Sequence, residues 1–108
     1  MSKLPMLESD IKGAARDYLR LTGWFTFPIM QGMGSYHGIP DRYAIKNGIE
    51  VWIEFKRPGG KQSEKQKIFQ SEIERHGGHY ILAESIDELI EKLKERGNNA
   101  TVSAGQKR

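Results

Sequence analysis

The sequence predicts a mixed α/β domain in which helices cover a small sheet, and three observations support this. Apolar residues recur at helical spacing near both ends of the chain and again after residue 63. Two runs of β-branched and aromatic residues flank Asn47-Gly48, which is the strongest short-range hairpin signal. A helical segment separates the second hairpin strand from a further apolar run, and such a crossover favours parallel pairing.

The composition excludes several classes of protein and of metal site. The 108 residues suffice for one domain, and no apolar run approaches the length of a membrane span. No signal-peptide core is visible, so we expect a cytoplasmic protein. The absence of cysteine excludes disulfides and thiolate zinc sites, and His37, His76 and His79 lack zinc-ligand spacing. Any metal is therefore expected to be bound by oxygen.

The N-terminal third is expected to form a helix, a strand and a loop. Apolar residues at helical spacing predict a helix over residues 5–21, with Gly23 suited to its C-terminal cap. Residues 24–29 are predicted to form a strand, and Pro28 places it at a sheet edge or ends it early. Residues 30–39 contain three glycines, and we expect a mobile loop there.

The hairpin fixes a register for its two strands. If Asn47 and Gly48 form the turn, Tyr43 lies opposite Trp52 and Asp41 lies opposite Glu54. Side chains alternate along a strand, so Glu54 and Lys56 point to the same face. The open end of the hairpin is thus predicted to gather two carboxylates and an ammonium group.

Two carboxylates at that distance repel each other unless a proton or a cation lies between them. Their hard oxygen ligands favour Mg²⁺ or Mn²⁺, and a neighbouring lysine positions or activates a water. The alternative is a surface salt-bridge cluster on an ordinary hairpin. Two prolines favour a functional site, because Pro40 fixes the backbone before Asp41 and Pro58 ends the second strand.

The C-terminal half is expected to contain two capped helices around a strand. Ser63 followed by Gln66 is a capping box that opens a helix ending at Gly77-Gly78. A short buried strand over residues 79–84 and a second capping box at Ser85 and Glu88 follow. We expect the last helix to end before Gly97, residues 1–97 to form the domain, and residues 98–108 to be a polar, disordered tail.

Three segments together resemble a known nuclease core. Gly38-Ile39-Pro40-Asp41, Glu54-Phe55-Lys56 and Gln66 are similar to the PD-(D/E)xK superfamily, and more narrowly to the standalone phage-type members of its VRR-NUC family. The resemblance extends from Glu8 to about Leu93. It implies an αβββαβ restriction-endonuclease-like core with a mixed sheet flanked by helices, and a metal-dependent endonuclease in residues 1–97.

The resemblance also implies roles for individual residues. Asp41, Glu54, Lys56 and Gln66 would be catalytic. Mg²⁺, for which Mn²⁺ may substitute, would be held by Asp41, Glu54, the backbone carbonyl of Phe55 and Glu8. Two of these residues also have structural explanations: a charge in the first helical turn accounts for Glu8, and capping accounts for Gln66.

A basic segment beside the carboxylates predicts contact with DNA phosphates. The residues expected to bind DNA are Arg57, Lys61, Lys65 and Lys67, with Tyr36 and His37 from the preceding loop. A solvated loop and helix face is the alternative. The resemblance implies a homodimer that cleaves branched DNA such as Holliday junctions. The competing hypotheses are a non-catalytic DNA-binding module or nuclease-like subunit of a larger phage complex, and a protein–protein adaptor.

Overall fold

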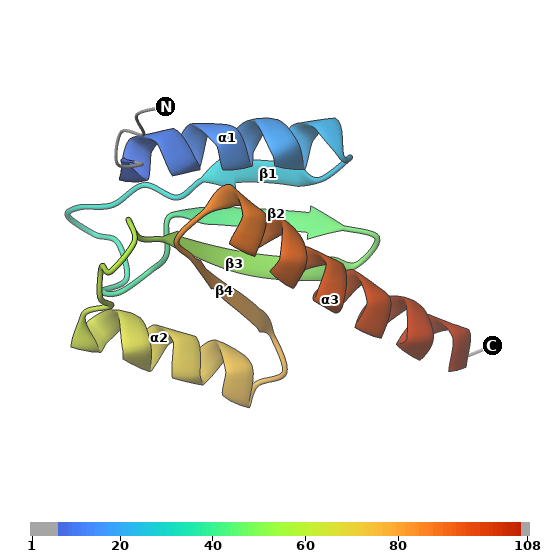
Figure 1. Cartoon of the computed structure of the whole chain (residues 1–108). Helices are drawn as coiled ribbons and strands as arrows, with labels where there is room; N and C mark the ends of the chain where they lie inside the picture. The colour runs from blue at the N-terminus through green and yellow to red at the C-terminus, as the bar shows by residue number, and fades with distance from the viewer. Residues whose placement is uncertain (1–6, 107–108) are drawn as a thin grey trace, which may run out of the picture.

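The computed structural model describes the backbone of residues 7–106 and the side chains of residues 7–97. Its elements follow the predicted order of helix, strand, hairpin, helix, strand and helix (Figure 1). Their bounds are α1 Glu8–Leu21, β1 Phe25–Pro28, β2 Arg42–Lys46, β3 Ile49–Phe55, α2 Glu64–Arg75, β4 His79–Ala83 and α3 Ile86–Gln106. This arrangement is the mixed α/β fold that the sequence predicts.

The strands form one four-stranded sheet in the order β1-β2-β3-β4. β2 pairs antiparallel with both β1 and β3, whereas β3 and β4 are parallel, as the helical crossover predicts. The hairpin register is also confirmed, because Tyr43 pairs with Trp52. Asn47 and Gly48 have φ angles of 53° and 82°, as a type I′ turn requires.

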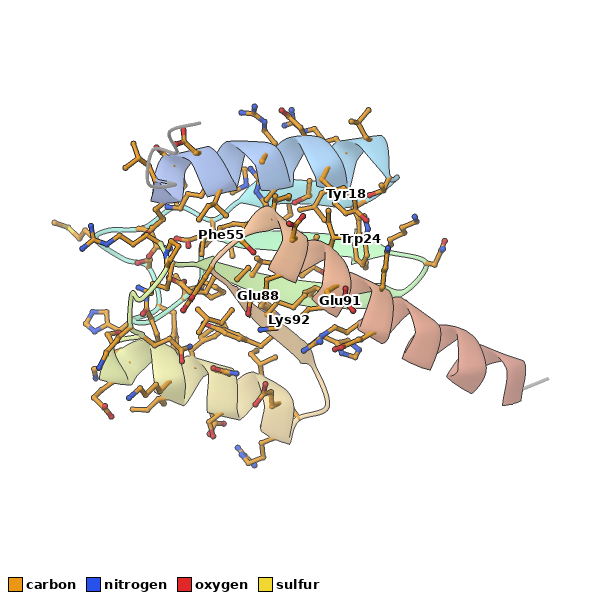
Figure 2. The ribbon with its side chains drawn as sticks, in the orientation of Figure 1. Tyr18, Trp24, Phe55, Glu88, Glu91 and Lys92 are labelled. Carbon is orange, nitrogen blue, oxygen red and sulfur yellow. The ribbon has the colours of Figure 1, made fainter. Side chains whose placement is uncertain are left out.

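The main core lies on one face of the sheet, between the strands and the helices α1 and α3. It is built from residues that lose almost all contact with solvent: Ile11, Ala15, Leu19, Ala44, Val51, Ile53, Phe55, Ile81, Ala83, Leu89 and Leu93. Tyr18 and Trp24 pack at its margin (Figure 2). α2 lies on the opposite side of the sheet, where Phe69 contacts the rings of Trp52 and Tyr80 (Figure 1).

Both edges of the sheet are obstructed. At β4, Lys92 donates to the Leu82 carbonyl at 2.9 Å and Arg96 donates to the Tyr80 carbonyl at 3.1 Å. Lys92 projects from α3 toward this strand (Figure 2). At the other edge, β1 is four residues long and ends at Pro28, as its sequence predicts.

The structure differs from the sequence predictions at three helix positions. α1 begins at Glu8 after Leu7 as its N-cap, and residues 5–6 of the predicted helix lie outside the described residues. The spacing of Ile68, Phe69, Ile73 and His76 predicts one apolar stripe on α2, but His76 is the C-cap of the helix and its side chain is 69% exposed, so it does not belong to that stripe. No helix in the described part of the chain is long and apolar enough to cross a membrane.

The third difference concerns the C-terminus. The sequence predicts a helix end before Gly97 and a disordered tail over residues 98–108, whereas α3 continues through Gly97 to Gln106. A glycine inside a helix costs only about 1 kcal/mol relative to alanine. No proline follows it, so no residue of this segment blocks the helical hydrogen bonds. Residues 107–108 lie outside the described residues.

Candidate active site

Asp41 lies immediately before β2, and its backbone and side chain are both fixed by β-sheet neighbours. Its amide donates to the Ile53 carbonyl at 3.0 Å, and its carbonyl accepts from the Ile29 amide at 2.8 Å. One side-chain oxygen, Oδ2, accepts from the Phe55 amide at 2.8 Å. The other side-chain oxygen, Oδ1, points to the region where the open end of the hairpin meets α1. The three hydrogen bonds together hold Asp41 beside Glu54.

Glu54 lies near the end of β3 with its side chain only 3% exposed. Its Oε2 is 3.5 Å from Lys56 Nζ and accepts from Gln66 Nε2 at 3.0 Å. Its Oε1 is buried and has no hydrogen-bond partner in the described part of the chain. The Lys56 amide donates to the Ala83 carbonyl at 3.0 Å, so parallel pairing with β4 positions this end of the strand.

The electrostatics of Glu54 are unusual for a carboxyl group. Burial, followed by the negative charge of Asp41, raises its pKa to about 7, and the opposing effect of Lys56 does not cancel the shift. Near neutral pH the group therefore exchanges readily between its protonated and ionised forms. A carboxyl group perturbed by burial and by a second carboxylate is typical of functional sites.

Gln66 connects the start of α2 to this pair. Its Oε1 accepts from the Ser63 amide at 2.8 Å, and its own amide donates to Ser63 Oγ at 3.1 Å, which is the predicted capping box. Its Nε2 simultaneously donates to Glu54. The structural and the functional explanations of Gln66 are thus compatible in one conformation.

Lys12, which was not predicted as a site residue, connects Glu8 to Asp41. Lys12 Nζ lies 3.4 Å from Glu8 Oε2 and 3.5 Å from Asp41 Oδ1, so it bridges α1 and the hairpin. Burial lowers the pKa of Lys12, but the charges of Asp41 and Glu8 outweigh it and raise the pKa overall. The sequence signal for this contact is the spacing of Glu8 and Lys12, which are four residues apart on a predicted helix and can therefore form an ion pair.

The loop between β1 and β2 packs against the first turn of α2. Gly38 has a φ angle of 86°, and a Cβ there would collide with the Lys65 carbonyl. Gln31, also missed in the sequence, donates to the carbonyls of Ile39 and Pro40 at 3.1 and 3.0 Å. These contacts hold the loop in place just before Asp41.

The residues predicted to bind DNA lie on this side of the site and are exposed. They are Tyr36, His37, Arg57, Lys61, Lys65 and Lys67. The contact between Gly38 and Lys65 brings the loop residues Tyr36 and His37 near the start of α2. Lys67 is 3.5 Å from Glu64, and both side chains are solvent-exposed. Their roles in DNA binding stay predictions.

The donor atoms at the site suit a hard divalent cation. Glu54 Oε1 is a buried oxygen without a partner, and Asp41 Oδ1 already faces a cation, the Lys12 ammonium. Within the described residues, no three acidic, histidine or cysteine side chains converge on one point. The predicted ligand roles of Asp41, Glu54, Glu8 and the Phe55 carbonyl all stay predictions.

Comparison with known proteins identifies the fold. No protein-family model and no curated protein matches the sequence. A solved structure described as "VRR_NUC domain" superposes with a TM-score of 0.71 and covers 81% of this chain and 94% of its own. This chain has the fold of a VRR_NUC domain. The identity between the two sequences is 16%, so the similarity lies in the architecture.

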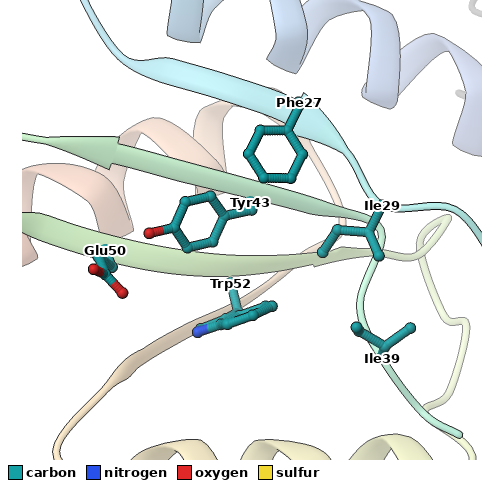
Figure 3. Close-up of a pocket in the computed structure, with 6 residues that line it drawn as sticks. All are labelled: Phe27, Ile29, Ile39, Tyr43, Glu50 and Trp52. Carbon is teal, nitrogen blue, oxygen red and sulfur yellow. The ribbon is translucent and has the colours of Figure 1, made fainter. Parts of the chain in front are cut away.

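One face of the sheet is only partly covered by helices (Figure 1). On the face of the sheet that carries Trp52, an apolar groove of about 460 Å³ is lined by Phe27, Ile29, Ile39, Tyr43, Glu50 and Trp52 (Figure 3). α2 packs against β4 and leaves the β1 side of this face uncovered (Figure 1). Phe25, Met30 and Met33 are apolar and could on that ground complete the core, but they are 67%, 81% and 106% exposed.

Proposed function

We propose that the chain is a metal-dependent DNA endonuclease of the VRR-NUC type. The observation that carries the proposal is Glu54, a buried carboxyl group with an unpartnered oxygen, beside Asp41 and Lys56. A hairpin with a merely structural role gains nothing from a buried acid whose pKa is raised by a second acid. The VRR_NUC fold of the chain supports the same conclusion.

In this proposal, Asp41 and Glu54 hold Mg²⁺ or Mn²⁺ with the Phe55 carbonyl, and Glu8 is the candidate for a further ligand. When bound, the ion supplies Lewis-acid polarisation of the scissile phosphate and lowers the pKa of a water. Asp41 is preorganised because its Oδ2 is fixed by the Phe55 amide. Glu54 is oriented by Gln66, and its ionised carboxylate would be the form that holds the cation.

Lys56 provides positive charge where negative charge develops during phosphodiester hydrolysis. Its side chain is 18% exposed and stays within 3.5 Å of Glu54. The turn after β3 supports it, because Gly60 packs against the Lys56 side chain closely enough that a Cβ would lie 3.3 Å from Lys56 Cβ. A lysine held in this position stabilises the transition state electrostatically and orients the attacking water.

We further propose that the enzyme acts on branched DNA, such as a Holliday junction, as a homodimer. The apolar groove and the exposed Phe25 and Phe27 support association through the open sheet face, since monomers rarely expose contiguous apolar surface (Figure 3). A second copy of the chain would cover this face in a two-fold arrangement. Sedimentation of the wild type and of Phe27→Glu tests this, and a wild type that stays monomeric at all concentrations would contradict it.

The decisive experiment is cleavage of a labelled four-way junction, with linear duplex and flap DNA as controls. Wild type and Lys56→Ala are compared in Mg²⁺, Mn²⁺ and EDTA. We expect metal-dependent cutting by the wild type, none in EDTA, and loss of cutting in the variant. Salt-dependent binding without cutting under every metal would instead favour a non-catalytic DNA-binding module, and absence of DNA binding would favour an adaptor.

A further inference from the structure

A second group of basic residues lies on α1, away from the basic segment predicted from the sequence. Lys12, Arg16 and Arg20 are four residues apart, so they share one stripe of the helix at intervals of about 6 Å. The stripe is adjacent to the buried row Ile11, Ala15 and Leu19. It therefore runs beside the line where α1 meets the sheet.

This stripe starts at the carboxylate pair, because Lys12 Nζ is 3.5 Å from Asp41 Oδ1. Beyond Lys12 its positive charge is only weakly compensated. Arg16 Nε donates to its neighbour Asp17 at 3.0 Å in an exposed pair. Among the residues with described side chains, no carboxylate lies within 4 Å of the Arg20 guanidinium.

Arg42 adds a third guanidinium beneath the stripe. It is 7% exposed, and its Nη1 donates to Thr26 Oγ1 at 3.1 Å, with no carboxylate partner in the described part of the chain. Its nitrogens that lack a protein partner keep contact with solvent. Burial lowers the pKa of Arg42, and the positive charges of Arg20 and Arg16 lower it further.

The helix dipole explains the position of only one of these guanidinium groups. Arg20 lies in the last turn of α1, where a cation interacts favourably with the helix dipole. That effect does not explain Arg42, since a buried cation among like charges is unfavourable unless an anion compensates it. Two guanidinium groups four residues apart on a helix also repel each other. An anion bound beside the three guanidinium groups would compensate their charge.

We propose that Lys12, Arg16, Arg20 and Arg42 form a track that binds the phosphates of the DNA strand flanking the scissile bond. This rests on the proposed nuclease function. The distance from Lys12 to Arg20 is about 12 Å along α1, and a strand of duplex DNA places one phosphate at roughly every 3.4 Å of the duplex axis, so a helix parallel to that axis would pass three to four phosphates. Because α1 and α2 lie on opposite sides of the β2–β3 hairpin, the two basic groups flank the carboxylate pair (Figure 1).

The test compares salt dependence of binding to the four-way junction in EDTA. The double variant Arg16→Ala/Arg20→Ala is expected to lower the slope of log K against log salt by about two, one for each lost phosphate contact. The matched control, Arg75→Ala/Lys94→Ala, removes two positive charges from α2 and α3 and is expected to keep the wild-type slope. Alanine favours helix, and circular dichroism verifies the fold of both variants.

A second measurement locates the contacts. Single phosphates near the cleavage position are replaced by neutral methylphosphonates, one position at a time. On one side of the cut, within about four nucleotides, replacement is expected to weaken binding by the wild type and by the control, and to have no effect on Arg16→Ala/Arg20→Ala at the positions that Arg16 and Arg20 contact. Retention of the full interference pattern by this variant would overturn the track.

The outcomes separate this inference from the proposed function. If the wild type cleaves the junction while Arg16→Ala/Arg20→Ala keeps the full salt slope, the track is wrong and the nuclease proposal stands. If the control lowers the slope as much as the double variant does, the effect is one of net charge and the track is also wrong. A wild type that neither binds nor cleaves DNA would overturn both.

Discussion

The two faces of the sheet differ in how far helices cover them and in the residues that they bury. On the face covered by α1 and α3, β3 contributes the apolar residues Val51, Ile53 and Phe55, each 0% exposed. On the other face the same strand carries Glu50, Trp52 and Glu54, of which Glu54 alone is as deeply buried. Ile53 and Glu54 are thus consecutive residues with nearly equal burial and opposite chemistry.

On β3, the residue that stabilises the fold, Ile53, is therefore the direct neighbour of the residue proposed to act in catalysis, Glu54. Burial of Ile53 removes apolar surface from water and stabilises the fold. Burial of Glu54 opposes folding when the group is ionised, and among the described residues its Oε1 gains no hydrogen bond in return. Substitutions at these neighbouring positions should therefore have opposite consequences, and the following predictions test that contrast from the largest effect to the smallest.

Glu54→Gln should reduce cleavage to background, a loss of at least about 10²-fold, because the amide cannot ligate a divalent cation as a carboxylate does. Its fold should be intact, since Gln is isosteric. Cleavage of the junction in Mg²⁺ and denaturant unfolding measure the two properties. Full activity in this variant would remove Glu54 from the proposed site.

Ile53→Ala should show the reverse pattern. Truncation of an aliphatic side chain in a packed core costs about 2–5 kcal/mol of the free energy of unfolding. The carboxylate pair on the other face is not touched, so the folded fraction should retain cleavage at temperatures well below the midpoint. An unchanged unfolding midpoint would mean that this face does not supply the stability assigned to it.

The free energy of unfolding should depend on pH because the pKa of Glu54 differs between the folded and the unfolded state. Its pKa is raised from 4.5 to about 7 on folding, so the folded state binds the proton more tightly than the unfolded state does. The resulting stabilisation is fully present below pH 4.5 and is lost as pH rises through 7. In EDTA, the unfolding free energy of the wild type should fall over this range relative to Glu54→Gln.

The cation should act in the opposite direction to the proton. Because binding requires ionised Glu54, affinity for Mg²⁺ should rise with pH until the group is fully ionised above pH 7. Isothermal titration at several pH values measures this affinity. Parallel pH profiles of stability for wild type and Glu54→Gln, or an Mg²⁺ affinity independent of pH, would contradict the raised pKa.

Gln66→Ala should have the smallest effect on stability, at most about 1 kcal/mol for a lost helix cap. It should lower activity by a larger factor, because it also removes the hydrogen bond from Nε2 to Glu54. Ser85→Ala is the matched control, since it removes the cap of Glu88 at α3, remote in sequence from the carboxylate pair. If Gln66→Ala lowers activity no more than Ser85→Ala does at a similar loss of stability, Gln66 acts only as a helix cap.

Local signals in the sequence account for most of the fold. The turn at Asn47-Gly48 sets the hairpin register, and the crossover helix sets the parallel pairing of β3 and β4. The end of α3 was not predictable in this way, because Gly97 is compatible both with a helix end and with a helix interior. Propensity at a single glycine does not distinguish the two.

The site was predictable only where chemistry and spacing coincide in the sequence. Asp41, Glu54 and Lys56 belong to a hairpin whose register fixes them, and the structure places all three at its open end. Lys12 depends instead on how α1 packs against the sheet, which a sequence period does not specify. The capping boxes at Ser63 and Ser85 look alike in sequence, and only packing connects the first to Glu54.

The obstructed sheet edges have a consequence for aggregation. An exposed strand edge is a template for adding further strands without limit, which leads to fibres. Here Lys92 and Arg96 occupy carbonyls of β4, and β1 is short and ends in a proline that has no amide hydrogen. Growth by strand addition is therefore hindered at both ends, so the protein can expose an apolar sheet face and still remain protected from open-ended polymerisation.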